Sequence, residues 1–203
     1  MIRGFILLLS LVAAGGAAPA LPVPRAALPA VTMATDGRIA PGEWGNANVG
    51  VLPCGMLMLK QVGGRVWFAF VPDATHATCV DLFLQDASGV VHNLHASLQW
   101  GERVVAGSNW TDREPATRWG EPKHWSANRI AWAPGGREQS EATKQSFLPY
   151  EAHEFAIERA AFAGKEWRVR IELRDFAGKN PDVVFPAAST RYDASGWAVW
   201  RLE

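Results

Sequence analysis

The clearest alternation of hydrophobic and polar residues along the chain lies in the segment Glu166–Asp175. Every second residue in it is hydrophobic, and the residues between them are charged. The hydrophobic positions are Trp167, Val169, Ile171 and Leu173. A period of two places alternate side chains on opposite faces of a strand, whereas helical spacing would scatter the intervening arginines around a cylinder. The pattern therefore predicts a β-strand with one buried and one solvent-facing side.

Shorter hydrophobic or alternating segments predict further strands, separated by turn signals. The segments 56–62 and 65–71 flank the pair Gly63-Gly64, which is typical of a hairpin turn. The other expected strands are 78–85, 90–98, 153–157 and 197–202. Seven or more short strands of this kind are typical of an all-β fold, and we expect an antiparallel β-sandwich of the jelly-roll type.

Residues 101–149 interrupt this rhythm. The stretch contains four tryptophans among charged residues and recurring glycine and proline, and neither a period of two nor a helical period persists in it. Long segments without regular structure are uncommon in compact domains and are often functional. We therefore expect an irregular, tryptophan-rich insertion here, and we look for a binding site in it.

The N-terminus has the three parts of a secretory signal peptide. Arg3 supplies the positive start, an apolar run follows at 5–14, and residues 18–20 (Ala-Pro-Ala) fit a small-x-small cleavage site. An apolar run of this length is too short to span a bilayer, which needs roughly 20 residues. The expected divisions are a signal peptide at 1–20, a Pro/Ala-rich linker at 21–33 and a single domain at 34–203. We expect a periplasmic or secreted protein without a membrane span.

Export would place the two cysteines in an oxidising compartment, where disulfides persist. Cys54 and Cys79 are 25 positions apart. Closing a loop of that size would stabilise the fold by roughly 3 to 4 kcal/mol in the chain-entropy model. We expect the two cysteines to form a disulfide, with two buried free thiols as the alternative.

The composition narrows the classes of function. The chain has 20 Lys and Arg against 20 Asp and Glu, so it lacks the charge excess of most nucleic-acid binders, and we expect no nucleic-acid partner. Hydrophobic residues make up 48% of the chain and charged residues 20%, which excludes a disordered protein. The ten tryptophans are the one unusual feature.

The most specific string is residues 36–47, which reads Asp-Gly-Arg-Ile-Ala-Pro-Gly-Glu-Trp-Gly-Asn-Ala. It resembles the opening of the family 9 carbohydrate-binding modules and the related DOMON-like domains. Later strands of that family are similar to 56–71, 79–86, 150–157 and 197–202. The resemblance implies an antiparallel β-sandwich but implies less about the ligand, because this fold carries sugar binders, haem binders and other modules. The stretch 101–149 departs from the family, so no site residue is transferred, and Trp44 is interpreted as a structural residue.

Sugar recognition requires a flat apolar surface for the C–H face of a pyranose and polar groups for the hydroxyls around its rim. Indole rings meet the first need, and carboxylate, amide and guanidinium groups meet the second. The tryptophan-rich stretch supplies both kinds of group. The candidate ligand-binding residues are Trp100, Trp110, Asp112, Arg118, Trp119, Glu121, Trp125 and Asn128. We expect a non-catalytic carbohydrate-binding module in which at least one indole is exposed.

Other functions are kept as alternatives. A structural or protein-interaction module of the cell envelope would bury its tryptophans or present them to a protein partner. Haem binding is another alternative, but the sequence has no cysteine pair to which haem could be attached. A structural calcium ion would use carboxylates near turns, such as Asp73, Asp81 and Asp86. We expect no other cofactor. The motifs of serine hydrolases, zinc proteases and phosphate-binding loops do not occur in the sequence, so we expect no enzyme.

Overall fold

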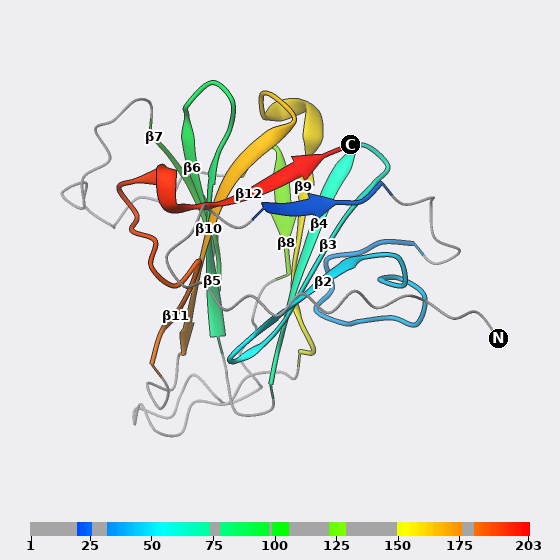
Figure 1. Cartoon of the computed structure of the whole chain (residues 1–203). Helices are drawn as coiled ribbons and strands as arrows, with labels where there is room; N and C mark the ends of the chain where they lie inside the picture. The colour runs from blue at the N-terminus through cyan, green and yellow to red at the C-terminus, as the bar shows by residue number, and fades with distance from the viewer. Residues whose placement is uncertain are drawn as a thin grey trace.

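Figure 1 shows the computed structural model of the chain as two β-sheets packed face to face. The structure describes residues 20–25, 32–73, 78–97, 99–105, 122–128, 150–175 and 181–203. The five-stranded sheet has the order β2 (Asn48–Leu52), β3 (Gly55–Val62), β4 (Arg65–Pro72), β9 (His153–Glu158) and β8 (Trp125–Ala127). The seven-stranded sheet has the order β1 (Ala20–Val23), β12 (Ala198–Leu202), β10 (Glu166–Asp175), β5 (Thr78–Gln85), β6 (Val91–Ala96) and β7 (Trp100–Val105), with β11 (Val183–Phe185) paired to β10. Two short 3-10 helices among the described residues are η2 (Arg159–Ala161) and η3 (Ala194–Gly196). The predicted all-β sandwich is confirmed.

The strand β10 lies inside the seven-stranded sheet and has the alternation that predicted it. It pairs antiparallel with β5, from Arg168 opposite Gln85 to Asp175 opposite Thr78. Its four hydrophobic side chains are all buried in the main core. The charged side chains between them therefore project from the opposite, outer face of the sheet.

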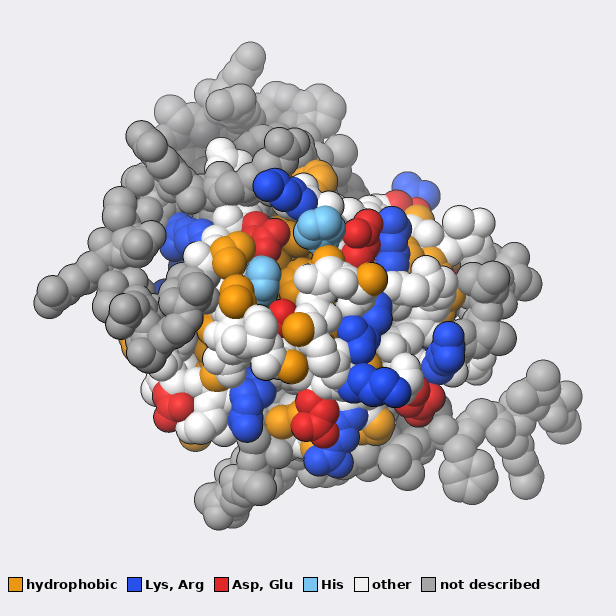
Figure 2. Space-filling view, turned by 90° about the horizontal axis from the view of Figure 1, so that it is seen from above, with side chains coloured by type: hydrophobic (Ala, Val, Ile, Leu, Met, Phe, Trp, Pro, Cys, Tyr) orange, Lys and Arg blue, Asp and Glu red, His pale blue; other side chains and the backbone are white. Residues whose placement is uncertain are grey.

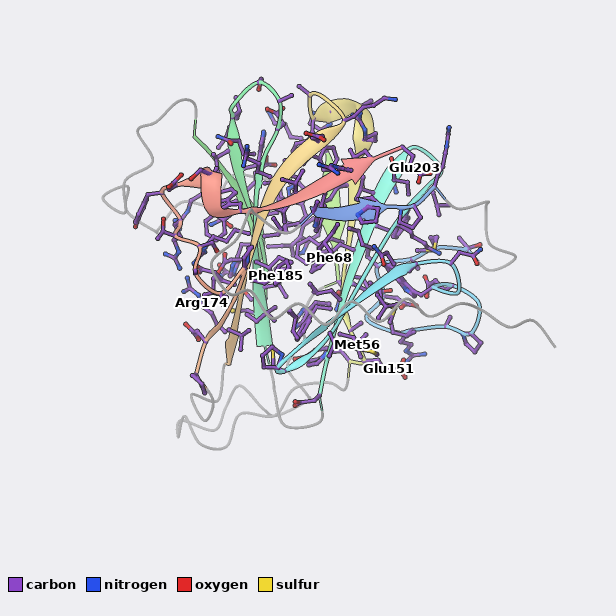
Figure 3. The ribbon with its side chains drawn as sticks, viewed as in Figure 1. Met56, Phe68, Glu151, Arg174, Phe185 and Glu203 are labelled. Atoms are coloured by element: carbon purple, nitrogen blue, oxygen red, sulfur yellow. The ribbon has the colours of Figure 1, made fainter. Side chains whose placement is uncertain are left out.

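The main core fills the space between the two sheets. Phe68 of β4 and Phe185 of β11 both lie there, one from each sheet, as Figure 3 shows. The ring of Phe68 lies 5.8 Å from that of Trp200 on β12, centroid to centroid. Because each large apolar side chain buried in this way stabilises the fold by roughly 1.5–3 kcal/mol, contacts across this space hold the sheets together.

The predicted hairpin between β3 and β4 is confirmed. The two strands pair antiparallel along their whole length, and Gly63 and Gly64 form the turn with φ values of 59° and 77°. Residues with a Cβ atom rarely adopt positive φ values at two successive positions, which explains why both turn residues are glycine.

The strand β1 corrects the expected linker at 21–33. Ala20–Val23 pairs in parallel with β12, so the sandwich is antiparallel except at this edge. Val23 is fully buried, and the side-chain nitrogen of Gln61 donates to its carbonyl oxygen at 2.8 Å. The prolines at 22 and 24 hide this strand, because they interrupt the alternation by which strands are read from sequence.

Two further strands lie within or beside the stretch that shows no periodicity. β7 and β8 lie at the ends of their sheets, and β8 is only three residues long, too short for a period to show. The predicted signal peptide lies outside the described residues except for Ala20. No helix in the described ranges is long and apolar enough to cross a membrane.

Residues 32–47, here called the cover, pack on the outer face of the five-stranded sheet (Figure 1). Trp44 of the cover is buried in a second hydrophobic cluster on that face. Gly37 has a φ of 82°, and a Cβ atom there would lie 2.9 Å from the side-chain nitrogen of Asn128, so the turn requires glycine. The structural interpretation of Trp44 is therefore confirmed.

The expected disulfide is wrong. Cys54 and Cys79 are both free and buried, the first in the turn between β2 and β3 and the second on β5 of the other sheet. Burial raises the pKa of the Cys54 thiol, and the charge of Asp73 adds to the effect. Burial, together with Asp81, raises the pKa of the Cys79 thiol to about 12. Because the thiolate is the reactive form, both cysteines are poorly suited to disulfide exchange.

Candidate functional site

The buried polar groups beneath the cover support the fold. The Glu154 carboxylate is fully buried and accepts the backbone N–H of Asp36 at 3.1 Å, that of Gly37 at 2.8 Å and the indole N–H of Trp44 at 3.3 Å. Burial raises the pKa of Glu154 to about 7, against the lowering effect of the Gly37 hydrogen bond. Lys60 is also buried and lies over the Trp44 ring, and burial lowers its pKa. These groups are enclosed, so they have no surface to offer a ligand.

Two of the tryptophans predicted to bind a ligand belong to the core or pack on it. Trp125 is 5% exposed, stacks on Phe155 with ring centroids 5.7 Å apart, and donates its indole N–H to Glu102 at 3.0 Å. Trp100 is partly buried against the main core, 6.0 Å from Trp125 between ring centroids. The prediction that Trp125 presents a face to a ligand is therefore wrong, because the edge strand β8 places its ring over the core.

Asn128 is a structural residue as well. It is 5% exposed, its side-chain nitrogen donates to the carbonyl of Ala152 at 3.0 Å, and its side-chain oxygen accepts the backbone N–H of Glu154 at 2.6 Å. Both ends of the Asn128 amide are thus used to hold β9 beside the cover. This corrects the prediction that Asn128 binds a ligand. The remaining predicted residues lie outside the described residues and stay predictions: Trp110, Asp112, Arg118, Trp119 and Glu121.

The outer face of the seven-stranded sheet carries a different set of polar groups. The register of β10 against β5 puts Arg170 opposite Phe83, Glu172 opposite Asp81 and Arg174 opposite Cys79. Because these residues alternate with the core positions, they share the outer face. Figure 3 shows Arg174 on this side of the sheet, away from the core residue Phe185.

Three guanidinium groups converge on the Glu172 carboxylate, and we call Arg170, Arg174 and Arg191 the arginine cluster. Oε1 of Glu172 accepts from Arg170 Nη1 and from Arg191 Nε, the latter at 2.6 Å. Oε2 accepts from Arg191 Nη2 and from Arg174 Nη2, the latter at 3.1 Å. Arg174 Nε also lies 3.5 Å from Asp81 Oδ2. Glu172 is 6% exposed, whereas the side chains of Arg174 and Arg191 are 42% and 29% exposed.

The charge state of Glu172 follows from these contacts. Burial alone would raise its pKa, but hydrogen bonds from Arg191 and Arg170 and their positive charges lower the pKa to about 2. The carboxylate is therefore ionised throughout the range in which proteins work. It is a buried anion that fixes two partly exposed cations at the surface.

The loop between β11 and β12 brings Arg191 to this place. Trp197 is buried, packs edge-on against Phe83 with centroids 6.0 Å apart, and donates its indole N–H to the carbonyl of Thr190 at 2.7 Å. The guanidinium carbon of Arg191 lies 5.6 Å from the centroid of the Phe83 ring. A turn closed by the Thr190–Asp193 bridge presents Arg191 and Tyr192 at its tip, and Tyr192 is 49% exposed.

A hydrogen-bonded chain of Asp81, His95 and Ser97 lies on the same face. His95 Nδ1 is 2.9 Å from Asp81 Oδ1, and His95 Nε2 is 2.8 Å from Ser97 Oγ. The order of the three groups is that of a serine hydrolase triad. The Ser97 hydroxyl also bonds to the backbone oxygen of Gln99 at 3.0 Å and accepts its backbone N–H at 3.2 Å. The Ser97 hydroxyl therefore stabilises the turn after β6. We infer that the hydrogen-bonded side chains of Ser97 and His95 position Asp81 beside Arg174.

The sequence pattern does not single out this site. The alternation in β10 predicts a solvent-facing side, and the signal that could have identified the site is its three arginines and one glutamate at every second position, which concentrate charge there. Asp81 and Asp86 were candidates for a structural calcium site. Within the described residues, however, no group of three or more His, Cys, Asp or Glu side chains could hold a metal ion. Asp86 instead accepts the backbone N–H groups of Ser88 and Ala163.

Comparisons with known proteins do not identify a relative of the chain. No family model matches the chain, and no curated protein or solved structure matches it. The resemblance of residues 36–47 to the family 9 carbohydrate-binding modules therefore stays a prediction.

Proposed function

We propose that the protein is an exported, non-catalytic carbohydrate-binding module whose ligand lies on the outer face of the seven-stranded sheet. The observation that carries the proposal is the pair of partly exposed guanidinium groups fixed by buried Glu172, with the exposed ring of Tyr192 next to Arg191 in the chain. A phenol ring offers a flat face for sugar C–H groups, and guanidinium groups donate to sugar oxygens.

The difference between the two outer faces supports this placement. The cover and Trp44 close the outer face of the five-stranded sheet, and the polar groups beneath it are buried. The outer face of the seven-stranded sheet keeps Arg174 and Arg191 in contact with solvent. The first five residues of the tryptophan-rich stretch, 101–105, belong to β7 at the edge of the same sheet. Trp110 and Trp119 lie outside the described residues and stay predicted ligand-binding residues.

Replacing Tyr192 tests the proposal. Tyr192→Ala should weaken the binding of any saccharide ligand about tenfold, because it removes a stacking surface. Met56→Ala is the matched control, since Met56 is 39% exposed on β3 of the other sheet (Figure 3) and should leave affinity unchanged. The measurement is calorimetric titration with neutral and acidic oligosaccharides of glucan, xylan and pectin type. Equal loss in both variants, or no binding by the unchanged protein, would contradict the proposal.

A second candidate is a protein-interaction module of the cell envelope, and the burial of tryptophan favours it. Six of the seven tryptophans in the described ranges are buried: Trp44, Trp67, Trp125, Trp167, Trp197 and Trp200. On the described surface seen in Figure 2, however, basic, acidic and histidine side chains lie intermingled, and hydrophobic side chains form only small separate areas. Broad hydrophobic areas are typical of protein docking surfaces, and none is seen among the described residues on this face of the molecule. The calorimetric titration distinguishes the two: binding of no saccharide by the unchanged protein supports the protein partner.

A further inference from the structure

We infer that the saccharide on this face is acidic and that Arg174 and Arg191 bind its carboxylate groups. The inference rests on the proposed function and adds the chemical class of the ligand. Among the described residues, the three guanidinium groups of the arginine cluster contact the carboxylates of Glu172 and Asp81. The side chains of Arg174 and Arg191 are 42% and 29% exposed, so two of these cations reach the surface, where an anionic group can pair with them.

The hydrogen-bonding groups lead to the same ligand. Guanidinium groups only donate, whereas a hydroxyl of a neutral sugar both donates and accepts. The acceptors of the cluster are not open to a ligand, because both oxygens of Glu172 accept from arginines and the side chain of Asp81 is only 4% exposed. A neutral sugar would therefore meet donors without matching acceptors. A carboxylate only accepts, and the planar fork of a guanidinium fits its two oxygens with two parallel hydrogen bonds.

The two outward-facing arginines are held in place before a ligand arrives. Arg191 donates to both oxygens of Glu172, and Arg174 donates to one of them and lies beside Asp81. Fixing such long side chains at the moment of binding costs rotamer entropy, and here the buried carboxylates have already fixed them. Glu172 is thus a positioning residue, and the partly exposed guanidinium groups are the binding groups.

The chemical class is tested by matched ligands. The whole protein is titrated calorimetrically with an oligogalacturonate, with its methyl ester, which is the same sugar without charge, and with a sulfated galactan oligomer of equal length. We expect the oligogalacturonate to bind about tenfold or more tightly than its ester, the factor typical of a charge-assisted pair. Added NaCl should weaken binding of the acid and leave the ester unaffected.

A matched pair of variants locates the binding groups. Arg174→Gln should weaken oligogalacturonate binding about tenfold and leave the ester unchanged. Arg65→Gln is the control, because Arg65 lies on β4 of the other sheet, is 47% exposed and also faces a glutamate, Glu158, at 3.8 Å. It should change affinity by less than about twofold, as expected for an exposed ion pair. Arg174→Lys keeps the charge but loses the fork, so an intermediate loss is expected. Circular dichroism and urea unfolding show whether each variant is folded.

The outcomes separate the inference from the proposed function. Equal affinity for the acid and its ester would overturn the acidic ligand and leave carbohydrate binding in place. Binding of no saccharide by the unchanged protein would remove the proposed function itself. Tighter binding of the sulfated oligomer would overturn the choice of a carboxylate. If Arg174→Gln does not fold, the ester comparison and Arg174→Lys still decide.

Discussion

Two buried glutamates, one on the outer face of each sheet, have opposite surroundings. Glu154 lies beneath the cover and is held by neutral donors, the backbone N–H groups of Asp36 and Gly37 and the indole of Trp44. Glu172 lies on the open face and is held by fully charged guanidinium groups. Burial raises the pKa of Glu154 to about 7, whereas the arginines overcome burial and lower the pKa of Glu172 to about 2.

The difference explains why one face is closed and the other presents cations to solvent. Peptide and indole dipoles satisfy the hydrogen bonds of Glu154 without supplying charge, and they belong to a segment that seals the sheet. Two of the cations around Glu172, Arg174 and Arg191, reach solvent. A buried carboxylate can therefore either anchor a covering segment or orient exposed cations. The identity of its donors decides which role it has.

The largest expected effect comes from making both carboxylates neutral without changing their shape. Glu172→Gln should lower the free energy of unfolding by about 3–5 kcal/mol at pH 8, because it leaves buried guanidinium charge without a partner. Glu154→Gln should change it by no more than about 1 kcal/mol, since its amide oxygen still accepts two N–H groups and a buried charge is removed. Urea unfolding measures both values.

The control for this pair is Glu166→Gln. Glu166 is 65% exposed and pairs with exposed Arg201 on β12, so the change should cost no more than about 0.5 kcal/mol. Equal losses for Glu172→Gln and Glu154→Gln would contradict the contrast between charged and neutral donors.

A somewhat smaller effect is expected in the dependence of stability on pH. The folded pKa of Glu154 is raised from 4.5 to about 7, so its contribution is fully present below pH 4.5 and is lost as the pH rises through 7, by up to about 3 kcal/mol. The folded pKa of Glu172 is lowered from 4.5 to about 2, so its contribution is present above pH 4.5 and is lost as the pH falls towards 2.

One variant tests each of these two losses of stability, the one at alkaline pH and the one at acid pH. Glu154→Gln should flatten the loss between pH 5 and 8, and Glu172→Gln should flatten the loss at acid pH. Chemical unfolding at a series of pH values measures both limbs. A profile in which Glu154→Gln keeps the full alkaline loss would assign that loss to another group.

Sequence alone could predict the parts of the fold in which alternation is long enough to read. The strand β10 is the clearest case, because its ten residues cross the sheet with one face in the core. The strand β1 contains Pro22, is followed by Pro24 and has no alternation, so only its pairing with β12 reveals it. Trp125 sits in a polar stretch of sequence, yet the three-residue strand β8 lays its ring on the core.

The site shows the same limit. A period of two places Arg170, Glu172 and Arg174 on one face, and that much follows from sequence. Arg191 reaches Glu172 only because the loop before β12 folds back and Trp197 packs against Phe83. No local pattern encodes that approach, so the cluster could be found only once the loop was placed in space.

The smallest expected effect concerns the connection between the two sheets. Cys54 lies in the turn between β2 and β3 of the five-stranded sheet and Cys79 on β5 of the seven-stranded one, and both are free. A reductant should therefore leave the melting temperature unchanged, and both thiols should react with a thiol reagent only after unfolding, because burial raises the pKa of each. A disulfide closing that loop would be worth roughly 3 to 4 kcal/mol, so a clear fall in melting temperature on reduction would contradict the structure. Without a disulfide between these cysteines, the core and the hydrogen bonds that join the sheets, such as that from Gln61 to Val23, hold the two sheets together.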